Sequence, residues 1–231
     1  TAIAGDPGRN ADFYVDTLGL RFVKRTVNHD DTDTYHFYFG DRRGTPGTAI
    51  TFFPWTDDGR QGEFGAGQVG ATAYAIRPES LGYWRERLAA RGVDVEESER
   101  FGEPVLSFAD PDGIGLELVG TEAAAEAPAD PWGGSSVPAD HQLRGFDGVT
   151  LAVAGVEPTE RVLTEVLGYE LADEDGHRRR YRTAVGERPG TTVDLVGTDA
   201  ERGRMGVGTV HHVAFKAEDT DAQEAYREAF K

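Results

Sequence analysis

Cysteine is absent from the 231 residues, and methionine occurs only once. The lack of cysteine excludes disulfide bonds, thiolate catalysis and every metal site that is built on sulfur. Histidine, aspartate and glutamate are then the side chains left to bind a metal. These ligands favour a hard or borderline metal ion.

Long apolar runs are missing as well. No stretch approaches the roughly 20 apolar residues of a membrane-spanning helix, and no charged segment followed by an apolar one opens the chain as a secretion signal. A phosphate loop of the GxxxxGK type and a GxSxG elbow are also absent, which argues against nucleotide-binding and hydrolase classes. We therefore expect a globular protein of the cytoplasm.

Positive charge is scarce, because 41 Asp and Glu outnumber 24 Lys and Arg and leave a formal net charge of −17. Such a charge repels nucleic acids and anionic membranes, so neither is expected as a partner. The acids are dispersed along the chain, and lysine occurs only at positions 24, 216 and 231. Dispersed acid with little lysine resembles proteins of salt-accumulating halophiles, and an ordinary acidic cytosolic protein is the alternative.

The two ends of the chain are unusual. Thr1 follows no initiator methionine, and the last residues, TDAQEAYREAFK, stop within a helical pattern. We interpret the chain as an internal piece of a longer protein. Part of a functional site is then expected to lie outside the printed sequence.

An internal repeat is the strongest sign of how the chain is organised. Residues 1–19, TAIAGDPGRNADFYVDTLG, align without a gap on residues 150–168, TLAVAGVEPTERVLTEVLG, at a constant spacing of 149. In both copies a short strand pattern precedes a proline near a helix start, apolar residues at helical spacing, and a glycine where the helix should end. The repeat predicts two copies of one folding unit.

Strand patterns follow each copy, and two further units fit the same plan. Residues 69–120 give a strand, a helix at 78–92 and three more strands, and a fourth unit begins with the strand pattern GTVHHVAFK at residue 208. We predict an α+β fold of tandem βαβββ modules, whose curved, cup-like mixed sheets carry helices on the outer face. The predicted division is two modules over 1–120 (the first strand truncated), a linker over 121–145, and a third module with the truncated start of a fourth over 146–231.

Several stretches carry a resemblance to a known family. They are VNHDDTDTYHFYFGD at 27–41, GTPGTAITFFPW at 44–55, GTVHHVAFKAED at 208–219, the helix ending FYVDTLGL at 13–20 and the turn DPDG at 110–113. On tandem βαβββ modules, they resemble the vicinal-oxygen-chelate superfamily of glyoxalases, antibiotic-resistance proteins and extradiol dioxygenases. Within it, the chain looks most like the four-module ring-cleaving dioxygenases that act on hydroquinones.

The resemblance implies a mononuclear Fe(II), or Mn(II) in some members, held by two histidines and one glutamate, with positions open for a substrate oxygen and dioxygen. The second of these histidines corresponds to His212. Alternation along a strand would place His211 and His212 on opposite faces, so at most one of them is expected to face the cup. In the third unit, Gly148 stands in the column of His212 and shares its face with the small Thr150 and Ala152. His212 is therefore assigned to the cup, and His211 to the other face or to the edge.

The other two ligands are expected outside these residues. The matching histidine of the first unit would stand before Thr1, and the carboxylate would follow Lys231. Glu117 is a competing candidate, because the resemblance places a carboxylate ligand there in members with a metal in that module. A structural glutamate held by backbone donors or by arginine is the alternative, since the second unit has no histidine on its first strand.

Three more residues are candidates for catalysis. Thr1 would share a face with the missing histidine, His36 alternates with the aromatic residues of TYHFYFGD, and His211 would exchange protons with a substrate, since imidazole titrates near neutrality. A buried, satisfied histidine is the alternative for His36. Two other sets are predicted to be solvated: the histidines at 29, 141 and 177, and the strand face HRRRY at 177–181.

The reaction that the resemblance implies is the opening of an aromatic ring by dioxygen. The expected partners are a small aromatic substrate, dioxygen and further copies of the same chain. A glyoxalase-like metal-dependent isomerase or lyase has the same fold, as does a binding protein without chemistry. Both stay open as alternatives, because a fold alone does not choose a function.

Overall fold

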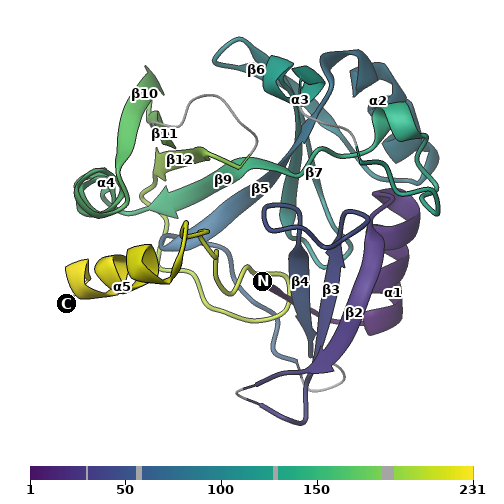
Figure 1. Ribbon diagram of the computed structural model, residues 1–231, viewed down its shortest axis with the longest axis horizontal. Coiled ribbons are helices and arrows are strands. Elements are labelled where there is room, and N and C mark those ends of the chain that lie inside the picture. Colours follow the sequence, from purple (N-terminus) through teal and green to yellow (C-terminus); the bar gives the residue numbers. More distant parts are fainter. Residues whose placement is uncertain (30, 56–58, 127–129, 184–189, 231) are drawn as a thin grey trace.

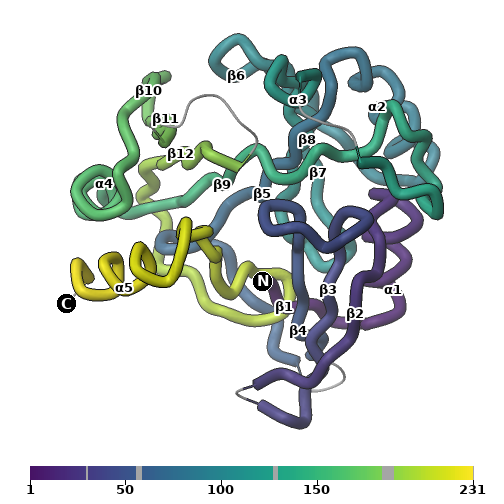
Figure 2. Tube along the Cα trace, in the orientation of Figure 1, coloured from purple at the N-terminus to yellow at the C-terminus, as the bar shows by residue number. Residues whose placement is uncertain are grey.

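The computed structural model of the chain describes residues 1–29, 31–55, 59–126, 130–183 and 190–230. Residues 127–129 of the predicted linker and 184–185 of a predicted strand lie outside the described residues. Figures 1 and 2 show two curved sheets with helices packed on their outer faces. None of the described helices is long and apolar enough to span a membrane.

The first module forms a four-stranded sheet in the order β1-β4-β3-β2, and β1 pairs with β4 in parallel. Its helical connection lies between the first two strands, as the βαβββ pattern predicts. Its elements are β1 (Ala2–Ala4), α1 (Pro7–Asp12), the π-helical turn η1 (Phe13–Thr17), β2 (Arg21–Val27), β3 (Tyr35–Gly40) and β4 (Ile50–Pro54).

The second and third modules share one eight-stranded sheet in the order β10-β11-β12-β9-β5-β8-β7-β6, in which β9 and β5 pair antiparallel. Figure 1 shows this pair crossing the middle of the molecule. The second module consists of β5 (Gln68–Ile76), η2 (Pro78–Ser80), α2 (Leu81–Ala90), β6 (Glu96–Arg100), β7 (Glu103–Ala109) and β8 (Gly115–Gly120). The third consists of β9 (Phe146–Val153), α4 (Val156–Arg161), η4 (Val162–Val166), β10 (Tyr169–Asp175), β11 (Arg178–Thr183) and β12 (Thr192–Gly197).

The internal repeat is present in three dimensions. Helices α1 and α4 begin 149 residues apart, and each continues into a five-residue π-helical turn. Each turn is followed by a glycine with positive φ, Gly19 at 72° and Gly168 at 68°. At Gly19 a Cβ would lie 2.5 Å from the side chain of Val137, so both the backbone and the packing require glycine there. The prediction of tandem βαβββ modules in an α+β fold is confirmed.

The main core is formed by side chains of the first module together with those of α2 and the strands of the second module. Tyr14 of η1 packs on Phe39 and Phe52, with ring centroids 5.4 and 4.6 Å apart. Trp84 and Leu88 of the predicted helix are completely buried. A smaller cluster under α4 contains, among others, Val153, Leu163, Tyr181, Val193 and Leu195.

The predicted linker is packed against the second module. It contains α3 (Glu122–Glu126) and η3 (Ala139–His141), and the indole of Trp84 donates to the backbone oxygen of His141 at 2.9 Å. The imidazole of His141 stacks on Tyr83 and bonds to Ser80. The expectation that His141 is solvated was wrong, because this ring fills the space beside α2, whereas His29 and His177 are exposed as expected. The domain division at 121–145 stays a prediction.

The strand predicted from residue 208 does not form. Val210 makes only an isolated bridge to Ala2, and residues 211–217 have no regular structure before the last helix, α5 (Thr220–Ala229). The preceding segment instead runs beside residues 61–66. Glycines allow this close approach, since a Cβ on Gly206 would lie 2.6 Å from the backbone nitrogen of Gly62.

The DPDG turn ties the second module to the first. Asp112 accepts hydrogen bonds from the backbone of Gly5 at 2.9 Å and from Arg9 at 2.5 Å. Asp110 accepts from the hydroxyl of Tyr14 at 3.1 Å and from two backbone N–H groups of its own turn. Burial raises the pKa of Asp110 to about 6, although its hydrogen bonds oppose the shift. Burial also raises the pKa of Asp147 to about 7.

The raised pKa of Asp110 predicts a pH-dependent stability. A carboxyl with a folded pKa near 6 and an ordinary unfolded value binds a proton on folding between these two values, so the free energy of unfolding should rise as the pH falls from 7.5 to 5. Asp110→Asn should remove about 1 kcal/mol of that rise, measured by urea denaturation at both pH values. Asp33→Asn, at an exposed carboxyl, is the control. Equal pH dependence in wild type and Asp110→Asn would show that Asp110 ionises normally.

Candidate functional site

The two adjacent histidines lie beside the start of the chain. The backbone N–H groups of His211 and His212 donate to the oxygen of Thr1 at 2.9 and 3.3 Å, and the nitrogen of Thr1 donates to the oxygen of His212 at 3.0 Å. The Nδ1 atoms of the two imidazoles are 2.8 Å apart. The expectation that they face opposite sides was wrong, because the segment is not a strand and alternation does not apply to it.

The inner face of the first sheet, opposite α1, carries a second group of candidates. His36 on β3 and Thr51 on β4 are joined by a 2.8 Å hydrogen bond between Nε2 and Oγ1. Thr51 bonds to the hydroxyl of Thr1 at 2.7 Å, and the Tyr38 hydroxyl lies 2.9 Å from Nδ1 of His36. Lys24 lies over the Tyr38 ring, 4.3 Å from its centroid.

Phe53 connects the two groups. Its ring lies 4.5 Å from His36 and 5.7 Å from His211, centroid to centroid. The structure therefore brings together all four residues singled out from the sequence, Thr1, His36, His211 and His212. Thr51 and Phe53 were missed, although their position in the alternating strand TAITFFPW would have shown that they share one face.

The pKa values of two of these histidines are lowered, which favours their neutral forms. Burial lowers the pKa of His36 to about 4, and His212 and Lys24 act in the same direction. Partial burial and the neighbouring His211 lower the pKa of His212. A neutral imidazole is the form that binds a metal.

The donor set fits a metal at one position. His212 has a neutral ring whose Nε2 makes no hydrogen bond to any of the described residues, so this atom is available for coordination. Among the described residues, no three His, Cys, Asp or Glu side chains gather as a complete ligand set. The chain as described therefore offers one ligand, with His211 beside it.

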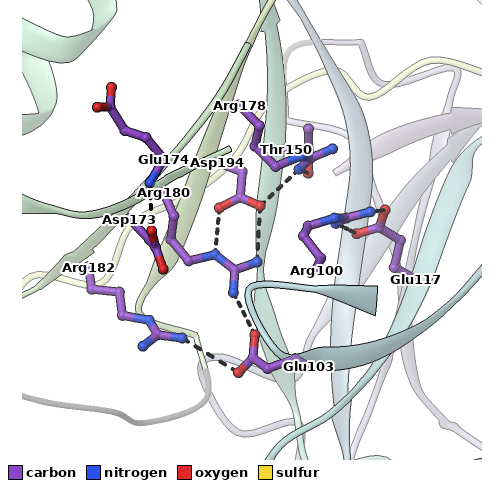
Figure 3. Close-up of polar contacts among 10 residues, drawn as sticks. All are labelled: Arg100, Glu103, Glu117, Thr150, Asp173, Glu174, Arg178, Arg180, Arg182 and Asp194. Atoms are coloured by element: carbon purple, nitrogen blue, oxygen red, sulfur yellow. Dashed lines mark hydrogen bonds and ion pairs between the residues drawn. The ribbon is translucent and has the colours of Figure 1, made fainter. Parts of the chain in front are cut away.

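Glu117 does not share this site. It lies on β8 within the eight-stranded sheet, and both its carboxylate oxygens accept from Arg100 of β6 at 2.9 and 2.8 Å. Figure 3 shows the two side chains facing each other. This is the arrangement of a structural glutamate held by arginine, the alternative considered from the sequence.

The run HRRRY was misread as a solvated face. Arg180 on β11 is 3% exposed and bonds to Asp194 of β12 through Nε at 2.8 Å and Nη2 at 3.1 Å. It also reaches Glu103 of the second module at 2.5 Å, and Arg178 bonds to Asp194 at 2.8 Å (Figure 3). Alternation along β11 points Arg178 and Arg180 into the sheet's inner face, where the carboxylates lie.

A strained turn completes this network. Phe101, between β6 and β7, has a φ of 52°, in the left-handed region that non-glycine residues rarely adopt. Its ring lies 4.5 Å from the guanidinium of Arg180. A cation–π contact of this kind offsets part of the strain. The second and third modules are thus joined by charge pairs as well as by β5 and β9.

Comparison with known proteins identifies relatives along nearly the whole chain. The family model "Glyoxalase/Bleomycin resistance protein/Dioxygenase superfamily" matches residues 1–118. The chain is 45% identical to the Bacillus subtilis (strain 168) protein named "Putative ring-cleaving dioxygenase MhqO", over 96% of this chain and 70% of MhqO. It is 35% identical to the Sphingobium indicum "Chlorohydroquinone/hydroquinone 1,2-dioxygenase", over 98% of this chain and 72% of the dioxygenase.

Solved structures also resemble the chain along most of its length. A crystal structure of a "putative dioxygenase" from Bacillus subtilis subsp. subtilis str. 168 superposes with a TM-score of 0.92 at 43% identity, over 99% of this chain and 72% of that one. Glyoxalase I from Zea mays gives a TM-score of 0.65 at 16% identity, over 88% of this chain and 69% of that one. The second likeness shows a common fold alone.

The buried charge network predicts a large effect on stability. Arg180→Met should lower the free energy of unfolding by about 3 kcal/mol, because it leaves Glu103 and Asp194 with too few partners in a buried setting. Arg204→Met, which breaks an exposed pair with Glu63, should cost at most about 1 kcal/mol. Urea denaturation of both variants measures the difference. Equal losses would mean that the Arg180 network contributes no more than a surface pair.

Proposed function

The chain belongs to the glyoxalase/bleomycin resistance protein/dioxygenase superfamily, and we propose that it is a metal-dependent ring-cleaving dioxygenase that opens a hydroquinone- or catechol-type ring with dioxygen. The observation that carries the proposal is the pair His211–His212 seated against Thr1 and Phe53. The relatives named ring-cleaving dioxygenases, at 35–45% identity over most of the chain, support it.

The metal is proposed to be Fe(II), with Mn(II) as the alternative, and His212 to be one of its ligands. His212 has a neutral ring and a free Nε2, which suits this role. Because no complete ligand set gathers among the described residues, and the chain covers 70% of MhqO, we propose that the other two ligands lie outside the described residues.

The metal would supply coordination positions for a substrate oxygen and for dioxygen and would transfer electron density between them. The residues of this chain bind and orient the ring. Phe53 gives an aromatic wall between His36 and His211, and the exposed His211 lies where it can accept a proton from a substrate hydroxyl and return it. We propose that cleavage is of the extradiol type, beside an oxygen-bearing carbon.

The first test is oxygen uptake by the full-length protein, reconstituted anaerobically with Fe(II), on addition of a hydroquinone or a catechol. His212→Ala should reduce the uptake rate by roughly a hundredfold or more, since even groups that only support a ligand cost 10–100-fold. His177→Ala, which removes an exposed imidazole far along the sequence, is the matched control. A wild type that binds one Fe(II) without uptake would contradict the dioxygenase and favour the isomerase or the binding protein.

We also propose that the protein works at high ionic strength in a cytoplasm, and as a homo-oligomer. The net charge of −17 with only three lysines supports the first point. Like charges at this density repel each other within the folded chain, and salt screens that repulsion. Arginine supplies the buried charge pairs, where its fork binds carboxylates through two atoms.

Salt should therefore stabilise the fold. The melting temperature should rise as KCl increases from 0.05 to 1 M, because the screening length falls from more than 10 Å to about 3 Å over this range. Differential scanning calorimetry at constant pH measures the rise. The range ends at 1 M because general salting-out acts mainly at higher concentrations. A melting temperature that stays constant or falls over this range would contradict adaptation to salt.

A further inference from the structure

A continuous chain of hydrogen bonds runs on the inner face of the first sheet from β3 through β4 to Thr1, the residue before β1. It runs from the hydroxyl of Tyr38 to Nδ1 of His36, from Nε2 of His36 to Thr51, and from Thr51 to Thr1, with donor–acceptor distances of 2.9, 2.8 and 2.7 Å. We call these four residues the hydroxyl–imidazole chain. It ends at Thr1, whose backbone is bonded to that of His211 and His212.

The chemistry of the members gives the chain one favoured direction. A phenol is a stronger acid than an imidazole N–H, so the hydroxyl of Tyr38 donates to Nδ1 of His36. His36 is neutral because burial lowers its pKa to about 4. A neutral ring that accepts at Nδ1 carries its one hydrogen on Nε2, and His36 must therefore donate to Thr51.

The same argument determines the direction of the hydrogen bond between the hydroxyls of Thr51 and Thr1. Thr51 accepts from His36 and uses its only hydrogen toward Thr1, whose oxygen thereby becomes an acceptor. The hydrogen of Thr1 is then left to point away from the chain. Since Thr1 is only half-buried, this hydrogen is available to a bound molecule.

We propose that Tyr38, His36 and Thr51 are positioning residues that hold the hydroxyl of Thr1 as a hydrogen-bond donor to a substrate oxygen beside His211 and His212. This inference rests on the proposed function for the identity of the substrate. It deepens that function by giving the site a hydrogen-bonding direction: the hydroxyl of Thr1 selects a substrate oxygen that accepts, as the deprotonated oxygen of a hydroquinone or catechol does.

The third module has a pair of polar residues at the equivalent positions of its sheet. Thr150 corresponds to Thr1 in the internal repeat and lies opposite Asp194 on β12. In the same way, Thr1 lies beside Thr51 of β4, one residue before the pair Ala2–Phe52. In the third module Arg178 bonds to both Thr150 and Asp194. Charge holds the pair there, whereas the first module uses a neutral chain that leaves the hydrogen of Thr1 free.

The test uses substitutions in the full-length, Fe(II)-loaded protein. Thr51→Val removes the central hydroxyl with little change in shape, Tyr38→Phe removes the first donor, and Thr51→Ser restores the hydroxyl. Thr26→Val is the matched control. It removes a hydroxyl from β2 that lies opposite His36 in the register but is not part of the hydroxyl–imidazole chain. Oxygen-uptake kinetics give kcat/KM for the aromatic substrate and KM for dioxygen.

Thr51→Val should lower kcat/KM for the aromatic substrate roughly tenfold, as the loss of one hydrogen bond to a charged oxygen predicts, without changing KM for dioxygen. Thr51→Ser should recover most of the rate, and Thr26→Val should match wild type. Loss in Thr51→Val that Thr51→Ser does not recover, or equal loss in Thr26→Val, would overturn the positioning role and indicate a packing effect.

A second readout does not depend on catalysis. Nitrogen-15 NMR of the imidazoles in the metal-free protein should show His36 as a single neutral tautomer with its hydrogen on Nε2, and as a mixture of tautomers in Tyr38→Phe. A mixture in the wild type, or the hydrogen on Nδ1, would overturn the proposed direction. If the wild type shows the single tautomer but consumes no oxygen, the dioxygenase proposal fails and the chain of hydrogen bonds stands.

Discussion

The parallel pairing of the first and last strands within each complete module determines which residues, distant in sequence, meet on each sheet. Strand β1 pairs with β4, β5 with β8 and β9 with β12, each time in parallel. Antiparallel neighbours along the chain can be joined by short turns, but these pairs bring together residues separated by a whole module. The contacts of Thr1 with Thr51 and of Thr150 with the Asp194 region follow from this one constraint, as does the place of Glu117 beside β5.

The two inner faces built on this pairing have opposite electrostatics. In the eight-stranded sheet, Arg100, Arg178 and Arg180 neutralise Glu117, Glu103 and Asp194, and the members are largely buried. Such pairs need each other, because a buried charge without a partner is costly. On the first sheet the central positions carry hydroxyls and a neutral imidazole instead. These groups satisfy one another through hydrogen bonds instead of ion pairs, and Lys24 lies beside them over the ring of Tyr38.

Local sequence patterns predicted the helices and strands of the fold. Much of the candidate site could not be predicted, because it depends on pairing between strands that are distant in sequence. A helix was predicted over residues 78–92, where Trp84 and Leu88 are buried, and the repeat located α4 from α1. Thr51 was missed because its importance depends on a strand that is distant in sequence. Arg180 was misread for a related reason: its charge suggests solvent, and only the neighbouring strand, with Asp194, shows that it is buried. The roles of Thr1, His36, His211 and His212 stay predictions.

His211 and His212 show why a break in regular structure is useful at this point. In a strand, their side chains would lie on opposite faces, and only one could reach a given ligand. Here residues 208–212 are hydrogen-bonded to Thr1 and Ile3, and residues 211–217 have no regular structure. The two imidazoles can then lie side by side, 2.8 Å apart at Nδ1. Under the proposed roles, His212 as a metal ligand and His211 as a proton acceptor would face one substrate from consecutive positions. The failure of the alternating pattern coincides with the candidate site, where local rules are most often broken.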